Sequence, residues 1–209
     1  MGIAPTQKIM KNRFNWKRWL KNNSMTASLL NQWHERKHKI YQGKPSQQVF
    51  TEIYQQNTWQ SEESFSGSGS ELVHSQAIRE ALPQLWQKYK FKKILDIPCG
   101  DFNWQQHLDW TGLEYLGGDI VEEIIHKNQQ QYTQENIHFE VFNLLENALP
   151  EADVILVRDA WVHLSFEDIF KSIAQLKKSS VEYLLSTTFT AQKINLNITT
   201  GSWRAINLE

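Results

Sequence analysis

Two aspartates, Asp96 and Asp119, follow two apolar runs of the chain and could hold a polar ligand. The first run, 94–97, suits a central strand of a parallel sheet that is covered on both faces. Pro98 ends this run by removing a backbone N–H donor. In open α/β sheets, ligands bind in the crevice at the carboxyl ends of the strands. We therefore expect a small polar ligand at the carboxyl end of the first strand and the turn after it, namely at Asp96, Cys99, Gly100 and Asp101.

The residues around these aspartates favour a ligand without phosphates. The chain has neither the glycine pattern of a dinucleotide site nor that of a P-loop. Gly100 stands between Asp96 and Asp101, and two carboxylates repel phosphate. Asp119 follows Asp96 by about twenty residues, where an acid accepts hydrogen bonds from ribose hydroxyls. A cationic amino-acid group at Asp96 and a ribose at Asp119 describe S-adenosylmethionine, although both aspartates could also simply cap helices.

Apolar periodicity predicts an α/β fold, because strand-like and helix-like segments alternate along the chain. We expect strands at 94–97, 114–121, 137–144, 153–157 and 183–189. We expect helices near 49–59, 72–90, 104–110, 122–132 and 166–178, with Pro83 breaking or kinking the second. Right-handed crossovers then give a Rossmann-like parallel sheet flanked by helices.

Charge divides the chain of 209 residues into two parts. Residues 1–51 hold ten Lys or Arg and the single acid Glu35, whereas the remainder holds 22 acids and 12 bases, a net charge of −10. We predict a basic, aromatic-containing helical arm at 1–48 and one domain at 49–209. The arm could meet nucleic acid, an anionic membrane surface or the acidic face of the domain. Its aromatic and apolar members are Phe14, Trp16, Trp19 and Leu20.

Other residue types narrow the class of protein. Cys99 is the only cysteine, so an intramolecular disulfide and a Cys-rich zinc site are excluded. No run approaches the roughly 18 apolar residues of a membrane-spanning helix, and no secretory signal is evident, so we expect a cytoplasmic protein. His34 and His38 lack a third ligand at suitable spacing, and we predict no metal site.

Four motifs in a fixed order carry a family resemblance. They are Ile-Leu-Asp-Ile-Pro-Cys-Gly (94–100), Gly-Gly-Asp-Ile (117–120), Phe-Asn-Leu-Leu (142–145) and Asp-Val-Ile-Leu-Val-Arg-Asp (153–159). With them, residues 50–205 resemble the class I S-adenosylmethionine-dependent methyltransferases. The further segments Asn-Thr-Trp (57–59), Ser-Gly-Ser-Gly-Ser (66–70) and Trp-Val-His-Leu (161–164) look like an uncharacterised bacterial subgroup of the small-molecule type.

The resemblance implies a role for each matching position. Residues 96–102 would wrap the methionine part of the cofactor, Asp119 would bind the ribose, and the amide oxygen of Asn143 would accept the adenine amino group. The Ser/Gly loop at 64–70 would be a lid, although its composition also suits a plain linker. The predicted cofactor-binding residues are Trp59, Ser66, Gly67, Gly69, Ser70, Asp96, Pro98, Cys99, Gly100, Asp101, Phe102, Trp104, Asp119, Ile120, Asn143, Leu144 and Arg158.

Methyl transfer needs the acceptor to be positioned, and a base is needed only where the acceptor loses a proton. Asp159 and His163 are the nearest candidates by sequence, and we predict them as catalytic. Asp159 could instead pair with Arg158 or cap a helix, and His163 could be a packing residue at the helix start.

The C-terminal part leaves room for little beyond the fifth strand, so we expect the family's closing antiparallel strand pair to be incomplete or absent. An open edge strand would favour self-association into a homo-oligomer or pairing with a partner. We expect methyl transfer to a small-molecule or glycan-type acceptor. A nucleic-acid-binding or nucleic-acid-modifying protein that uses the basic arm and a non-catalytic relic of the fold are the alternatives.

Overall fold

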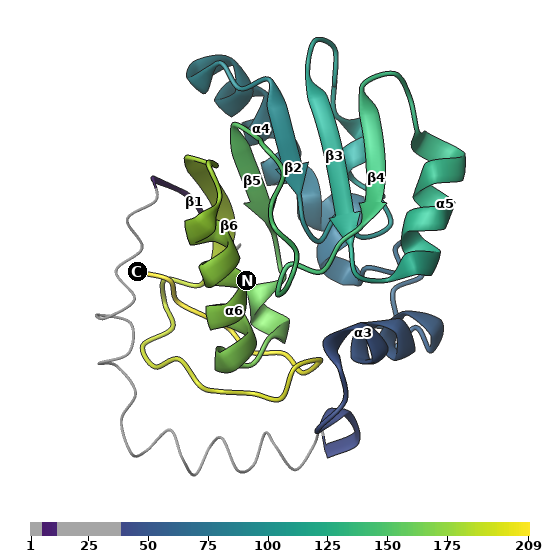
Figure 1. Ribbon diagram of the computed structural model, residues 1–209, viewed down its shortest axis with the longest axis vertical. Coiled ribbons are helices and arrows are strands. Elements are labelled where there is room, and N and C mark those ends of the chain that lie inside the picture. Colours follow the sequence, from purple (N-terminus) through teal and green to yellow (C-terminus); the bar gives the residue numbers. More distant parts are fainter. Residues whose placement is uncertain (1–5, 12–38) are drawn as a thin grey trace.

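A single sheet forms the centre of the molecule, for which a computed structural model describes residues 6–11 and 39–209. The strand order is β1-β6-β5-β2-β3-β4. Strands β2 to β6 run parallel, and β1 pairs antiparallel with β6 (Figure 1). The strands are β1 (Thr6–Lys11), β2 (Lys93–Asp96), β3 (Glu114–Asp119), β4 (Ile137–Val141), β5 (Val154–Val157) and β6 (Tyr183–Thr188).

Helices cover both faces of this sheet. Helices α4 (Leu72–Tyr89) and α5 (Glu122–Tyr132) pack on the face that carries Ile94, whereas α6 (Phe166–Lys178) packs on the face that carries Leu95. Successive residues of a strand point to opposite faces, so the apolar run of β2 supplies both cores. Helix α3 (Ser46–Gln55) lies beyond the carboxyl ends of β3 and β4 (Figure 1).

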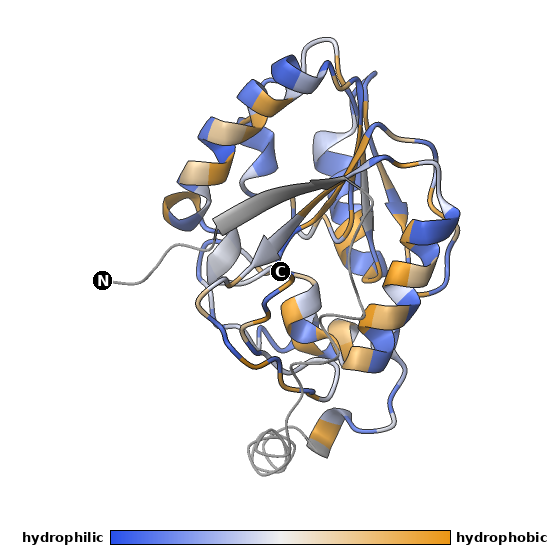
Figure 2. Ribbon diagram, turned by 90° about the vertical axis from the view of Figure 1, so that its left-hand side faces the viewer, coloured by the Kyte–Doolittle hydropathy of each residue, from blue (hydrophilic) through white to orange (hydrophobic). Residues whose placement is uncertain are grey.

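Local sequence signals explain where α6 begins and ends. The Ser165 side chain caps the helix by accepting a hydrogen bond from the Asp168 backbone N–H at 3.2 Å. Acids in the first turn and Lys177 and Lys178 in the last turn complement the helix dipole. Hydrophobic and hydrophilic bands alternate along the helices, as an amphipathic helix requires (Figure 2).

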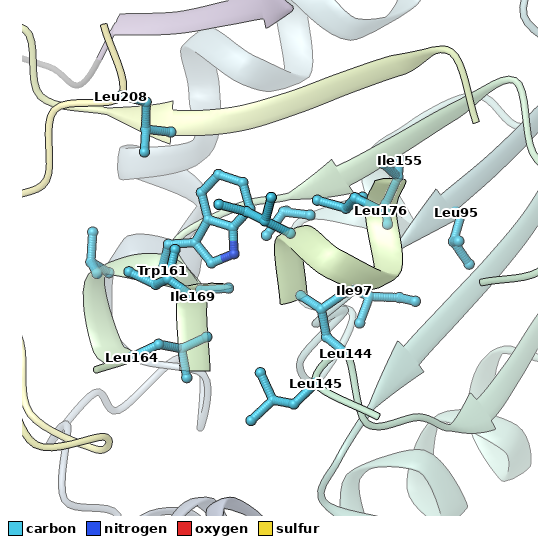
Figure 3. Close-up of a cluster of buried hydrophobic side chains, with 14 of the residues drawn as sticks. Leu95, Ile97, Leu144, Leu145, Ile155, Trp161, Leu164, Ile169, Leu176 and Leu208 are labelled. Carbon is cyan, nitrogen blue, oxygen red and sulfur yellow. The ribbon is translucent and has the colours of Figure 1, made fainter. Parts of the chain in front are cut away.

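The core under α6 is built around Trp161 (Figure 3). This indole is buried, and its Nε1 donates a hydrogen bond to Ser172 Oγ at 2.8 Å. Leu164, Ile169 and Leu208 surround it, so the C-terminal segment takes part in the core. Residues 189–209 therefore pack against the domain although they contain no helix or strand.

The structure confirms the α/β prediction. Helices α5 and α6 have the bounds expected from periodicity, and all five predicted parallel strands are present. Helix α4 continues through Pro83 without a break, and the helix expected near 104–110 is only the 3-10 turn Gln105–His107. After β6, the described chain contains no further strand.

Residues 6–11 of the predicted helical arm form strand β1, which occupies the sheet edge next to β6. The rest of the arm, including Phe14, Trp16, Trp19, Leu20, His34 and His38, lies outside the described residues. The boundary predicted at 48/49 falls inside α3, and the division into arm and domain stays a prediction. Within 6–11 and 39–209, no helix is long and apolar enough to cross a membrane.

Removing a core side chain of β5 should lower stability strongly. Ile155 is fully buried between the helix layers, so Ile155→Ala should lower the free energy of unfolding by about 2–5 kcal/mol. Urea unfolding followed by circular dichroism measures this loss. Val141→Ala, at a half-exposed position of edge strand β4, is the control and should change stability by about 0.5 kcal/mol or less. Equal losses in both variants would contradict this packing.

Candidate functional site

A cavity of about 1000 Å³ opens at the carboxyl ends of the parallel strands. It is bounded on one side by these strand ends and on the other by α3 and the loop 61–71. The predicted site residues that line it are Trp59, Ser66, Gly67, Gly69, Ser70, Asp96, Pro98, Cys99, Gly100, Trp104, Asp119, Ile120, Asn143, Leu144, Arg158, Asp159 and His163. The topology therefore brings together residues that are spread over more than half of the sequence.

Asp96 is a buried carboxylate at the end of β2. Its Oδ2 accepts hydrogen bonds from Gln105 Nε2 and from Tyr115 Oη, both at 2.9 Å. Its Oδ1 is also buried and has no hydrogen-bond partner among the described residues. Burial raises the pKa of Asp96 from 3.8 to about 6, although the two hydrogen bonds oppose the shift. A cationic ligand group with N–H donors would satisfy the unpaired oxygen.

Asp119 ends the neighbouring strand β3 and faces the same cavity. Its Oδ2 accepts the Gly100 backbone N–H at 3.1 Å, and its Oδ1 accepts that of Val121 at 3.0 Å. Burial raises its pKa to about 6, and the backbone hydrogen bonds oppose the shift. Each oxygen keeps a second lone pair, so the carboxylate can also accept hydrogen bonds from a ligand diol.

The Ser/Gly loop is folded over the turn that follows β2. Asp101 holds it, because its carboxylate accepts hydrogen bonds from Ser64 Oγ at 2.9 Å, Phe65 N–H at 2.8 Å and Ser66 Oγ at 3.1 Å. Ser66 Oγ in turn accepts the Asp101 backbone N–H at 2.9 Å. The loop is therefore an ordered cover of the cavity, which a plain linker would not be. Asp101 itself fastens this cover and does not line the cavity.

Arg158 and Asp159 follow β5 and contact the loop from the other side. The Arg158 guanidinium lies 3.1 Å from Asp159 Oδ2 and donates a hydrogen bond from Nη2 to the Gly69 carbonyl at 2.7 Å. It also stacks over the Trp104 ring at 5.4 Å from the centroid. Asp159 has the ion pair with Arg158 that the sequence left open as an alternative, yet it also lines the cavity.

His163 is fixed by the C-terminal segment. Its Nδ1 lies 2.9 Å from the Ser202 carbonyl oxygen, which can only accept, so Nδ1 carries the proton and Nε2 keeps a lone pair. The imidazole packs on Trp59 with ring centroids 4.9 Å apart. Burial lowers the pKa of His163 to about 4, so the ring is neutral at pH 7.

Phe102 and Asn143 differ from their predicted roles. Phe102 has a φ of 57° that turns its ring away from the cavity and into the aromatic core with Tyr115 and Phe139. The Asn143 amide oxygen already accepts the Leu145 backbone N–H at 3.0 Å. The prediction that Phe102 lines the ligand site is wrong, because an aromatic ring is more stable in this apolar cluster. Asn143 lines the cavity, and one lone pair of its amide oxygen is used by the hydrogen bond from Leu145.

Comparison with solved structures identifies the fold. Magnesium protoporphyrin IX methyltransferase (ChlM) from Synechocystis PCC 6803 with bound SAM matches with a TM-score of 0.51 and 14% identity, over 66% of this chain and 73% of that protein. The DhpI–SAH complex matches with a TM-score of 0.50 and 15% identity, over 69% and 71% of the two chains. The fold is that of the class I S-adenosylmethionine-dependent methyltransferases.

The chain spans about half the length of another matched structure. The PH0226 protein from Pyrococcus horikoshii OT3 has 23% identity and a TM-score of 0.40, and the match covers 50% of this chain and 52% of that one. No protein-family model and no curated protein sequence matches the chain.

Several residues of this methyltransferase-fold cavity were not predicted. Gln105 holds Asp96, and nothing in the sequence around it indicates a buried amide. Phe189, at the end of the predicted strand 183–189, also lines the cavity, as does Trp203 from a region that has no periodic pattern. Phe50, Tyr54 and Phe65 form an aromatic wall on the opposite side, which the apolar residues of α3 could have indicated. In the part of the chain that is described, no three His, Cys, Asp or Glu side chains cluster as metal ligands.

A substitution at Gly100 should release the loop. Gly100 has a φ of +60°, and a Cβ there would overlap Ser66 Oγ. Gly100→Ala should therefore cost roughly 1–2 kcal/mol of backbone strain and also raise amide hydrogen exchange at 61–71. Mass spectrometry of peptic peptides measures this exchange. Gly112→Ala is the matched control, because Gly112 has a φ of +71° with no atom within 4 Å of its Cβ. Equal exchange at 61–71 in both variants would contradict the contact.

His163 should make stability depend on pH. Its pKa of about 4 in the folded state is below the unfolded value of 6.5, so the unfolded state binds more protons between these values. The stability of the wild type relative to His163→Asn should then rise by about 1–2 kcal/mol between pH 4 and 6.5 and stay constant above. Urea unfolding at several pH values measures this difference. A difference that does not change with pH would show that the ring is solvated.

Proposed function

We propose that this chain transfers the methyl group of S-adenosylmethionine to a small-molecule acceptor. The observation that supports it best is the pair of buried carboxylates, Asp96 and Asp119, which end adjacent strands in one cavity of about 1000 Å³. The fold shared with methyltransferases whose structures contain SAM or SAH agrees with this reading.

The residues fit this cofactor. The unpaired Oδ1 of Asp96 would accept N–H donors of its ammonium group, and the spare lone pairs of Asp119 would accept its ribose hydroxyls. Ile120 and Leu144 offer apolar surface beside Asp119 for a base. The loop 61–71, held by Asp101, would exclude water from the reacting atoms.

S-adenosylmethionine supplies a methyl carbon that is already activated by the sulfonium, and the carbon–sulfur electron pair returns to sulfur on transfer. The chain's part is to orient the acceptor and to accept a proton from it. Asp159, at the end of β5, is the group we propose to take the proton of an acceptor hydroxyl. His163 is neutral and its Nε2 has a lone pair, so it would accept a hydrogen bond that orients this hydroxyl.

Binding of the demethylated cofactor tests the proposal. S-adenosylhomocysteine should bind the full chain in isothermal titration calorimetry. Asp96→Asn and Asp119→Asn should each weaken binding by about ten- to hundredfold, because a charge-assisted hydrogen bond contributes more than a neutral one. Since both carboxylates have pKa values of about 6, affinity should rise with pH between 5 and 7 and then level off.

Asp109→Asn is the control for loss of a charge, because Asp109 is exposed and outside the cavity, and it should bind like the wild type. Circular dichroism of each variant separates lost binding from lost structure. Absence of S-adenosylhomocysteine binding to the wild type at millimolar concentration would refute the proposed function.

A further inference from the structure

The cavity extends beyond the strands that would hold the cofactor. Asp96 and Asp119 end β2 and β3, and Asn143 follows β4, whereas another part of the wall lies over β5 and β6. Asp159, His163, Phe189 and Trp203 belong to this second part. The cavity volume of about 1000 Å³ is at the upper end of the range of about 300–1000 Å³ for small-molecule sites.

Trp203 is presented to the cavity by a fixed backbone. Its neighbours Ser202 and Arg204 are only 2% and 4% exposed, whereas Trp203 is 52% exposed. The Arg204 backbone N–H donates to the Val162 carbonyl at 3.0 Å, and the Gly201 N–H donates to the His163 carbonyl at 2.8 Å. An exposed tryptophan between two anchored neighbours differs from an aromatic side chain on a loose terminus.

The Arg204 guanidinium supplies much of this anchoring. It donates hydrogen bonds to the carbonyl oxygens of Trp161 at 2.5 Å, Leu164 at 2.8 Å and Leu196 at 3.0 Å. The bonds to Trp161 and Leu164 tie the segment that carries Trp203 to the turn that carries His163. The backbone that carries the two rings is therefore held in place by the protein itself.

Three side chains of this wall carry rings, namely His163, Phe189 and Trp203. Phe189 and Trp203 meet at close to a right angle, with centroids 6.0 Å apart at 88°, and the indole is 52% exposed, so part of its surface stays available for a further ring. Trp59 packs on His163 at 4.9 Å. Rings prefer offset-stacked or edge-to-face partners, so this wall is best satisfied by a planar aromatic ligand.

The polar lining limits the charge of such a ligand. Among the described residues, the cavity wall carries the acids Glu80, Asp96, Asp119 and Asp159 and one strong base, Arg158, which is already paired with Asp159. An anionic acceptor would be repelled. Asp159 and the Nε2 of His163 can both accept a hydrogen bond, so the complementary ligand group is a donor such as a hydroxyl.

We propose that the acceptor is a neutral, planar aromatic molecule with a hydroxyl group, and that its ring stacks on Trp203. This inference rests on the proposed function. The hydroxyl proton goes to Asp159, the oxygen forms a bond to the methyl carbon of S-adenosylmethionine, and the carbon–sulfur electron pair goes to sulfur. The products are an aryl methyl ether and S-adenosylhomocysteine.

Three probe molecules of similar size test whether the site prefers an aromatic, planar and neutral ligand. They are 2-naphthol, decahydro-2-naphthol and 2-naphthoate, each titrated calorimetrically into the full chain with and without saturating S-adenosylhomocysteine. We expect 2-naphthol to bind at least tenfold more tightly than either of the other two. Comparable binding of decahydro-2-naphthol would overturn the aromatic preference, and tighter binding of 2-naphthoate would overturn the neutral one.

Substitutions at Trp203 test whether 2-naphthol binds against this residue. Trp203→Leu keeps an apolar side chain without a ring face and should weaken 2-naphthol binding by about three- to tenfold. Trp203→Phe keeps a ring and should stay within about twofold. Ile40→Ala, at an exposed apolar position that does not line the cavity, is the control and should bind like the wild type. An unchanged affinity in Trp203→Leu would refute the subsite.

Titrations with S-adenosylhomocysteine and with 2-naphthol distinguish failure of this inference from failure of the proposed function. Binding of S-adenosylhomocysteine without 2-naphthol binding would refute the aromatic subsite and leave methyl transfer supported. Binding of 2-naphthol without S-adenosylhomocysteine binding would refute methyl transfer and leave the aromatic subsite supported.

Discussion

The buried carboxylate of Asp96 is the constraint around which the site is built. A carboxylate without partners would be very unfavourable in this apolar interior. Tyr115 on β3 and Gln105 on the following turn both donate to one of its oxygens, so a single group ties β2, β3 and that turn together. The other oxygen has no described partner, and the pKa rises to about 6. The fold thus holds an incomplete hydrogen-bond network where a cationic ligand would complete it.

A second carboxylate, Asp101, holds the loop through hydrogen bonds in the way that Asp96 holds the strand ends. Backbone and hydroxyl donors of 64–66 would be left without protein partners if the loop opened, and Asp101 satisfies three of them in the closed arrangement. Gly100 makes this possible, because its missing side chain leaves space for Ser66 Oγ. Arg158 holds the opposite end of the loop through the Gly69 carbonyl. The cover of the cavity is therefore fastened at both ends by charged groups.

The sequence predicted those features that depend on local periodicity and on strand ends. The 3.6-residue periodicity of apolar residues predicted the bounds of α5 and α6, and the apolar runs predicted the five parallel strands. Asp96 and Asp119 could be placed in one crevice because parallel strands end at the same edge. Phe102 could not be placed, because its positive φ depends on packing among distant aromatic residues. For the same reason, the positions of the Gln105 amide and the Trp203 indole could not be predicted from the sequence. Their partners are separated in sequence and meet only through the fold.

The C-terminal segment shows how irregular backbone can replace regular structure at a site. An antiparallel strand pair would have satisfied its backbone groups through a sheet ladder, whereas residues 189–209 combine isolated backbone hydrogen bonds with hydrogen bonds to side chains. Asn195 and Asn207 bond across the segment, with Asn195 Nδ2 donating to the Asn207 carbonyl at 2.7 Å and the Asn207 N–H donating to Asn195 Oδ1 at 2.8 Å. Arg204 then joins the segment to the turn after β5. Because this backbone is free of ladder geometry, it can expose Trp203 and orient His163 from one short stretch, and few residues determine this side of the cavity wall.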